Sequence, residues 1–299
     1  MSFIAFAPQT ILAETDSARV ARLFRWASEG NVRYASYVEP AKDSLAQMGQ
    51  TGARWLSRYL FTVDARERLR LAEIFEKMGT VATPFIVPYL DSAGEDAPRN
   101  AARCLERIKD TAAVMPLLAH LDHPEYSVRS QVATALGKTA DRRALAPLIA
   151  ALESDADSDV RKSCAVALGY LPDTAATRVL FRALNDEFYG VRQAAIRALA
   201  QHDQTVALPD GITTTPDVIV ALGATGDPES RQWLRKLLDD PDPKRRGFAV
   251  EGLSQKGPLE SAKAIAKLKA KETDPFVLAQ IARFEQIVLE KQHEQPRSR

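Results

Sequence analysis

The sequence predicts an all-α protein built from stacked helical repeats. One phrase occurs three times, opening with a Val-Arg pair and closing with Ala-Leu, and its leucine always lies seven residues after the arginine. The closing residues are Leu136, Leu168 and Leu199, so the phrase recurs after 32 and then 31 residues. A fixed period of this length marks proteins in which each repeat packs on its neighbours and no single globular core exists. A length of 299 residues would by itself suggest two globular domains, but the repeat argues against that division.

The first helix of each repeat is expected to be amphipathic. Its apolar residues recur at i, i+3, i+4 and i+7, which is the spacing of one helix face. The pattern is present in Val114, Leu117, Leu118 and Leu121, and again in Leu145, Leu148, Ile149 and Leu152. Pro84, Pro116 and Pro147 stand near the start of these helices. A missing N–H is tolerated there, because the first helical N–H groups have no partner within the helix.

The second helix of each repeat is apolar at positions −1, +3, +4 and +7, counted from the repeat arginine. Small residues at +3 and +4 allow neighbouring helices to approach closely, as stacking requires. Arg246 begins a fourth copy, with Ala249, Val250 and Leu253 at the same positions. The three closer copies are Val128, Val132, Ala133 and Leu136, then Val160, Cys164, Ala165 and Leu168, and then Val191, Ala195, Ile196 and Leu199.

A ladder of polar side chains is expected along the stack. An Asp or Asn precedes the repeat arginine by seven residues in three copies and by six in the remaining one. Such side chains can cap the second helix and bond to the arginine of a neighbouring repeat, which is a structural role. The predicted ladder comprises Asp122 and Arg129, Asp155 and Arg161, Asn185 and Arg192, and Asp239 and Arg246.

Looser copies extend the series in both directions. The closing residue is Met48, Met78 and Ile108 before the clear repeats, and Leu222 and Leu253 after them, with one step of only 23 residues between Leu199 and Leu222. The interruption over 202–216 is rich in turn-forming residues, and is either a degenerate unit or a loop that contacts a partner. The predicted organisation is an N-terminal segment and capping helix over 1–40, repeats over 41–201, a degenerate repeat or loop over 202–226, repeats and a cap over 227–290, and a disordered tail over 291–299.

Composition limits the partners and the compartment. Forty Lys and Arg against 39 Asp and Glu give a formal charge of +1, so the chain as a whole is not drawn to nucleic acid or to an anionic membrane. Cys104 and Cys164 lie on apolar-patterned helices, where a buried reduced thiol is usual. No segment reaches the roughly 20 apolar residues of a membrane span. We expect a cytoplasmic protein, or an exported one if residues 1–15 are the remnant of a leader.

The Val-Arg pairs and Ala-Leu-Gly endings over 111–201 resemble the HEAT-like repeat family, in the short bacterial form also found in phycocyanobilin lyases. The resemblance is weaker over 41–110 and 227–290. It implies a right-handed curved stack of antiparallel helix pairs, with the second helices lining the concave side. Its motifs specify the fold and say almost nothing about function, because repeats of this kind carry many functions.

Exposed aromatic residues are the best candidates for contacts with a partner. Tyr126 and Tyr189 each lie three residues before a repeat arginine, at equivalent turns, although tyrosine is also common at this turn for structural reasons. On the second helices, positions +2, +5 and +9 are expected to lie on the concave face of the stack. The candidate partner-binding residues are Tyr126, Phe188, Tyr189, Val166, Tyr170, Arg197 and Phe248.

A catalytic set is not recognisable in the sequence. His120 and His123 are three residues apart, but two ligands do not make a closed zinc site. We find no phosphate-binding glycine loop, nucleophile elbow or Cys-x-x-Cys pair, and we expect no cofactor. The sequence therefore favours a scaffold or regulator that is not an enzyme and that binds a protein or peptide through its concave surface and the turns between its helices. The alternative is a bilin lyase or tetrapyrrole chaperone, and a further alternative is a HEAT-like DNA-binding or DNA glycosylase-like protein.

Overall fold

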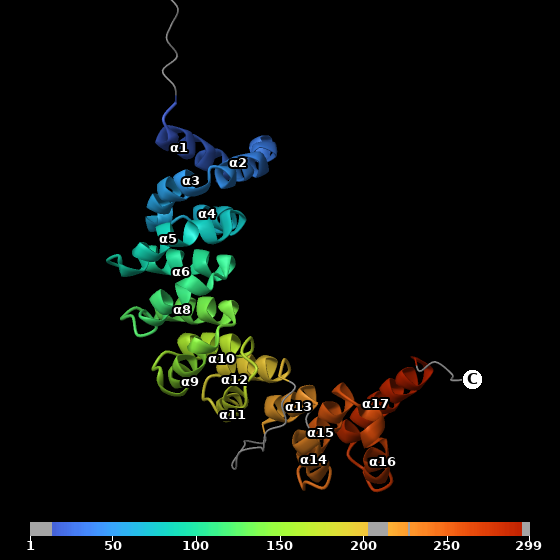
Figure 1. Ribbon diagram of the computed structural model, residues 1–299. Helices are drawn as coiled ribbons and strands as arrows, with labels where there is room; N and C mark the ends of the chain where they lie inside the picture. Colours follow the sequence, from blue (N-terminus) through green and yellow to red (C-terminus); the bar gives the residue numbers. More distant parts are fainter. Residues whose placement is uncertain (1–13, 203–214, 227, 295–299) are drawn as a thin grey trace, which may run out of the picture. The chain divides into compact units, whose positions relative to one another are not determined.

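The computed structural model describes residues 14–202, 215–226 and 228–294, and within these ranges the ordered elements are helices and 3₁₀ turns without a β-strand (Figure 1). The chain divides into two compact units, one ending at Ala113 and the other beginning at Val114. The predicted all-α repeat architecture is confirmed. No helix among the described residues combines the length and the apolar character needed to cross a membrane.

The first unit consists of short and long helices in alternation. Its second helices are α2, α4 and α6, which pack on one another in chain order. The predicted closing residues Met78 and Ile108 are the last residues of α4 and α6. The helices are α1 (Asp16–Ala27), α2 (Ala35–Gln47), α3 (Gly49–Leu56), α4 (Ala65–Met78), α5 (Thr83–Ile86) and α6 (Asp96–Ile108), with 3₁₀ turns at Val32–Tyr34, Ser57–Phe61, Gly79–Ala82, Val87–Asp91 and Thr111–Ala113.

The second unit contains the repeats with the clearest sequence pattern. Its first helices are α7 (Val114–Leu118), α9 (Leu145–Ser154), α11 (Thr174–Ala183), α14 (Pro228–Leu237) and α16 (Pro258–Lys269), and a 3₁₀ turn at Arg142–Ala144 precedes α9. Its second helices are α8 (Tyr126–Thr139), α10 (Ser158–Leu168), α12 (Tyr189–Leu199), α13 (Pro216–Thr225), α15 (Pro243–Gln255) and α17 (Pro275–Glu294).

The second helices of this unit form one continuous layer, in which each helix packs on the next. The apolar positions predicted for them are buried except Ile196, which is half-buried, and Leu136 and Leu168 have no exposed surface. Glycines permit the close approach: a Cβ added at Gly137 would lie 2.4 Å from the Ala167 Cα, and one at Gly223 would lie 2.0 Å from the Gly252 carbonyl oxygen. The Ala-Leu-Gly ending is therefore a helix-packing motif.

The shortened step in the repeat corresponds to α13. This helix packs between α12 and α15 as a second helix, but the segment in front of it does not supply a described first helix. Most of the predicted interruption, residues 203–214, lies outside the described residues, as do residues 295–299 of the predicted tail. Helix α17 runs to Glu294.

Candidate functional site

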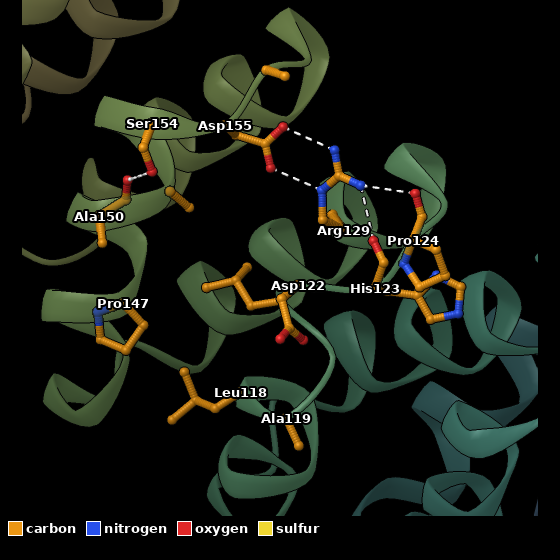
Figure 2. A pocket seen from close by; sticks show the side chains of 13 residues that line it. Leu118, Ala119, Asp122, His123, Pro124, Arg129, Pro147, Ala150, Ser154 and Asp155 are labelled. Atoms are coloured by element: carbon orange, nitrogen blue, oxygen red, sulfur yellow. Dashed lines mark hydrogen bonds and ion pairs between the residues drawn. The ribbon is translucent and has the colours of Figure 1, made fainter.

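The repeat arginines join consecutive repeats of the second unit. Arg129 donates two hydrogen bonds to Asp155, at 2.8 and 2.9 Å, and its third nitrogen donates to the carbonyls of His123 and Pro124 (Figure 2). Arg161 repeats the arrangement with Asp186, at 2.8 and 3.0 Å, and with two carbonyls of its own turn. Each guanidinium thus closes its own turn and holds the carboxylate of the following repeat.

The ladder continues through the rest of the unit. Arg192 donates to Asp217 at 2.9 Å, and Arg246 donates two bonds to Glu272. The carboxylates Asp155, Asp186 and Glu272 also accept the N–H two residues ahead, at the start of the next second helix. The acid therefore fixes both the neighbouring arginine and the helix that follows it.

In two rungs, the acid of the ladder lies six residues before the next repeat arginine, whereas Asp217 lies in the first turn of α13. Asp155 has this place, as predicted, and next to it in the stack the place is filled by Asp186 rather than by Asn185. Asp239 lies one position before the corresponding Asp240 and pairs with Lys271. Asp122 likewise lies one position too early, with His123 in the place of the acid.

The ladder carboxylates are held ionised. Burial opposes the charge of Asp155, but the hydrogen bonds from Arg129 and from the Asp157 N–H outweigh it and bring the pKa of Asp155 below its usual value. The hydrogen bond from Arg246 lowers the pKa of Glu272 to about 2. A carboxylate with a depressed pKa and a fully engaged arginine is a poor proton donor or acceptor near neutral pH. The ladder is a structural device.

A hollow of about 640 Å³ opens beside this ladder, between α7, α8 and α9 (Figure 2). Leu118, Ala119 and Pro147 line it on one side, and Asp122 lies among them. Its cation, Arg129, is already occupied by Asp155 and two carbonyls. This hollow therefore offers apolar surface and one carboxylate, without a free cation.

The outward face of the second helices carries part of the predicted set. Positions +2, +5 and +9 from the repeat arginine place Val166 and Tyr170 at and just after the end of α10, Arg197 on α12 and Phe248 on α15. The first three are exposed, and Phe248 is half-buried. We call this surface the second-helix face. Tyr170 is covered by the Lys138 ammonium, which lies 4.1 Å from its ring centroid.

The remaining predicted aromatics lie at the edge of the layer rather than on this face. Tyr126 and Tyr189 are the first residues of α8 and α12, and Phe188 is the N-cap of α12. All of them are exposed, and Arg192 lies 5.5 Å from the Tyr189 ring centroid. The structure thus divides the predicted set between the N-terminal edge of the layer and its face.

A hollow surrounds Phe248 and extends from the second-helix face to the N-terminal edge of the layer, where Pro216 and Pro243 begin α13 and α15. Two adjoining spaces of about 280 and 520 Å³ share Phe248 and Pro216. Cavities that hold small molecules measure on the order of 300–1,000 Å³ and are lined mostly by apolar groups with a few polar ones. We call the two spaces together the Phe248 hollow. The first is lined by Gln193, Ile196, Pro216, Asp217, Val220, Ala221, Ala224, Phe248, Glu251 and Gln255, and the second by Pro216, Pro243, Lys244, Phe248, Asp274 and Phe276.

Sequence reasoning found only one residue of this hollow as a candidate. Phe276 packs edge-on against Phe248, with ring centroids 5.3 Å apart, but it lies in the last repeat, where no Val-Arg pair marks the phase. On α13, Thr215 stands where the repeat arginine would be. Counting +2, +5 and +9 from Thr215 gives Asp217, Val220 and Ala224, which all line the hollow. The repeat spacing alone would therefore have pointed to these three lining residues, although α13 lacks the repeat arginine.

The thiols of the chain are unsuited to covalent chemistry. Cys104 and Cys164 are buried on α6 and α10 and make no disulfide. Burial raises the pKa of each thiol to about 12, so the nucleophilic thiolate is scarce. Within the described residues there is also no group of three or more His, Cys, Asp or Glu side chains that would hold a metal ion.

Comparison with known proteins identifies the repeats. The family described as HEAT repeats matches residues 83–169 and 145–210, and the family described as PBS lyase HEAT-like repeat matches residues 217–240. Among solved structures, the complex of CpcE and CpcF of phycocyanin lyase from Nostoc sp. PCC7120 aligns with a TM-score of 0.41 and 19% identity, covering 96% of this chain and 100% of that one. A designed armadillo repeat protein in complex with a (KR)4 peptide aligns with a TM-score of 0.41 and 16% identity, covering 79% of this chain and 98% of that one.

Two curated relatives share sequence with part of the chain. Phycocyanobilin lyase subunit alpha of Picosynechococcus sp. PCC 7002 is 35% identical over 117 residues, which cover 36% of this chain and 44% of the relative. The protein of the same name from Nostoc sp. PCC 7120 is 33% identical over 142 residues, which cover 45% of this chain and 47% of the relative. The match thus spans less than half the length of these relatives.

These relatives correct the functional interpretation drawn from the sequence. The expectation of a scaffold without enzymatic activity is wrong, because the curated proteins that share its sequence are named as subunits of a lyase. The absence of a recognisable catalytic set misled the prediction, since repeat motifs report the fold and not the chemistry. The resemblance on which the alternative rested is confirmed: residues 83–210 match HEAT repeats, residues 217–240 match the PBS lyase HEAT-like repeat, and part of the chain shares sequence with phycocyanobilin lyase alpha subunits.

Proposed function

We propose that this chain is a subunit of a bilin lyase, an enzyme that handles an open-chain tetrapyrrole during its attachment to, or removal from, a protein. The observation that carries the proposal is the shared sequence with phycocyanobilin lyase alpha subunits, at 35% and 33% identity. The match of residues 217–240 to the PBS lyase HEAT-like repeat supports it, because these residues include α13 in the Phe248 hollow.

The chemistry of the chain favours a non-covalent role toward the bilin. A bilin carried as a thioether needs a reactive thiol, and both thiols of this chain are buried with a pKa raised to about 12. The covalent acceptor must then lie on another protein. The chain holds and orients the chromophore, and the bond forms elsewhere.

A second protein is part of this proposal. The curated relatives are named as subunits, and the exposed aromatics of the N-terminal edge provide contact surface. Tyr126, Phe188 and Tyr189 present rigid aromatic groups at low entropic cost, a type of residue enriched at energetically important contacts. We assign this edge to the contact with the partner subunit or the acceptor protein.

The function is tested by measuring bilin attachment. Phycocyanobilin and phycocyanin apoprotein are incubated with and without the chain, and covalent product is followed by visible absorbance and by zinc-induced fluorescence after denaturing electrophoresis. We expect the chain to raise the rate by about tenfold or more, which corresponds to about 1.4 kcal/mol of transition-state stabilisation. Equal rates in the presence and absence of the chain, both alone and with the partner subunit added, would contradict the proposal.

A further inference from the structure

The Phe248 hollow combines apolar walls with one lysine, Lys244, and three carboxylates, Asp217, Glu251 and Asp274. Asp217 is paired with Arg192, and Asp274 accepts from the N–H groups of Phe276 and Val277 at the start of α17. Phe248 and Phe276 meet edge to face, and Pro216 and Val220 extend the apolar surface across α13. A conjugated ring system packs well against such walls, since aromatic contacts add to the gain from apolar burial. The hollow runs over three consecutive second helices, α12, α13 and α15, and reaches the start of α17. Its shape suits an elongated ligand.

Among the described residues, the lysine that lines the hollow has no carboxylate partner, whereas the arginines of the ladder are engaged. In the part of the chain that the structure describes, Lys244 and Arg197 have no carboxylate partner. Lys244 lines the hollow, and Arg197 lies one helical turn beyond Gln193, which lines it too. By contrast, Arg192 and Arg246 on the same two helices are held by Asp217 and Glu272. Free ammonium and guanidinium groups attract carboxylates.

The hollow also contains an acceptor for N–H groups. Glu251 is half-buried on α15, one turn from Phe248, and its carboxylate is not paired with a cation in the described ranges. Gln255 follows one turn later and donates to the Val220 carbonyl at 3.2 Å, which leaves its amide oxygen as a further acceptor. Pyrrole N–H groups require such acceptors when they leave water.

We infer that the Phe248 hollow binds a long, flat, conjugated dicarboxylate with N–H donors, which is the chemistry of an open-chain tetrapyrrole. The inference rests on the proposed lyase function for the identity of the ligand and on the hollow for its location. Phe248 and Phe276 stack on the conjugated system, Lys244 and Arg197 pair with its carboxylates, and Glu251 accepts from its pyrrole N–H groups. The hollow beside Asp122 does not serve, because its arginine is occupied.

The location is tested by titrating the purified full chain with phycocyanobilin and following the visible absorbance and induced circular dichroism. Variants Phe248→Ala and Lys244→Gln are compared with Phe61→Ala, an aromatic truncation at an exposed residue of the first unit that does not line the hollow. We expect Phe248→Ala to weaken binding by about tenfold or more, as truncation of a central aromatic contact does. Lys244→Gln should weaken it about threefold or more and reduce its dependence on salt. Phe61→Ala should bind like the unsubstituted chain.

The outcomes separate the site from the function. Unchanged affinity in both Phe248→Ala and Lys244→Gln, with binding retained by the unsubstituted chain, overturns the location and leaves the lyase proposal standing. Absence of binding by the unsubstituted chain overturns both. If far-ultraviolet circular dichroism shows that Phe248→Ala is unfolded, Lys244→Gln decides, because Lys244 is exposed and its loss does not disturb packing.

Discussion

At the scale of single residues, the repeat arginine performs two tasks with one side chain. In Arg161, one edge of the guanidinium grips Asp186 and the remaining nitrogen holds the carbonyls of Asp155 and Ala156. The planar fork of arginine meets these acceptors together, whereas lysine offers a single point charge. The recurrence of arginine at this place in the sequence therefore reflects geometry more than charge.

Replacing Arg161 by alanine tests this role. The side chains of Arg161 and Asp186 are 12% and 11% exposed, so the substitution leaves a nearly buried carboxylate without its partner. We expect a loss of about 2–4 kcal/mol in the free energy of unfolding, measured by urea denaturation. Arg142→Ala is the control, because Arg142 is 81% exposed in its pair with Asp173 and should contribute less than about 1 kcal/mol. Equal losses in the two variants would show that the ladder does not stabilise the stack.

At the scale of helices, close packing of second helices depends on small residues at their ends. Gly137 faces the backbone of Ala167, and Gly169 faces Ala198 at the same place in the next repeat. The added Cβ would stand 2.4 Å from Ala167 at Gly137 but 3.1 Å from Ala198 at Gly169. An added methyl group therefore causes a severe clash at Gly137 and a milder one at Gly169.

Substituting these glycines with alanine gives a quantitative prediction. Gly137→Ala forces α8 and α10 apart and should destabilise the chain by about 1–3 kcal/mol, as overpacking of a core does. Gly169→Ala requires a smaller shift and should cost less. Thermal unfolding of both variants measures the difference, and a Gly137→Ala variant as stable as the unsubstituted chain would contradict the packing described here.

The sequence predicted the second helices well because a single rule, apolar residues at fixed distances from an arginine, determines which face is buried. The sequence did not show which polar residue pairs with each repeat arginine. Asn185 and Asp186 are neighbours and both polar, and only the structure shows that Asp186 pairs with Arg161. The Phe248 hollow was found in part, through Phe248 itself. Lys244 and Phe276 escaped because they come from the starts of two helices and meet only when the repeats stack.

At the scale of the whole molecule, the ladder makes stability depend on pH. Asp155, Asp186, Asp217 and Glu272 have pKa values below those of free carboxyls, which are about 4 in an unfolded chain. The unfolded state therefore binds protons before the folded state does as the pH falls. The stabilisation is complete above about pH 5 and is lost progressively toward pH 2, where Glu272 takes up its proton.

Melting temperatures measured across this range test the prediction. We expect a plateau near neutral pH and a steady decrease below about pH 5. Glu272→Gln removes one of the carboxylates and should flatten the decrease, because the amide does not titrate. A melting temperature that stays constant or rises between pH 5 and pH 3 would be inconsistent with these pKa shifts.

The proposed function also belongs to the scale of the whole molecule, because it uses two separate surfaces of the helix layer. The Phe248 hollow would hold the bilin, and the aromatic edge of the same helix layer would hold the protein that accepts it. Since both cysteines are buried, the chain should leave the reaction unmodified. Holding without bonding is the central claim of this account.

A single-turnover transfer experiment tests that claim most directly. The chain is loaded with phycocyanobilin, separated from excess chromophore and mixed with phycocyanin apoprotein, and the position of the bilin is determined by intact-protein mass spectrometry under denaturing conditions. The account predicts that the mass of the bilin appears on the acceptor protein while the chain is recovered at its own mass. Bilin bound covalently to the chain, or an acceptor that gains none, would contradict it.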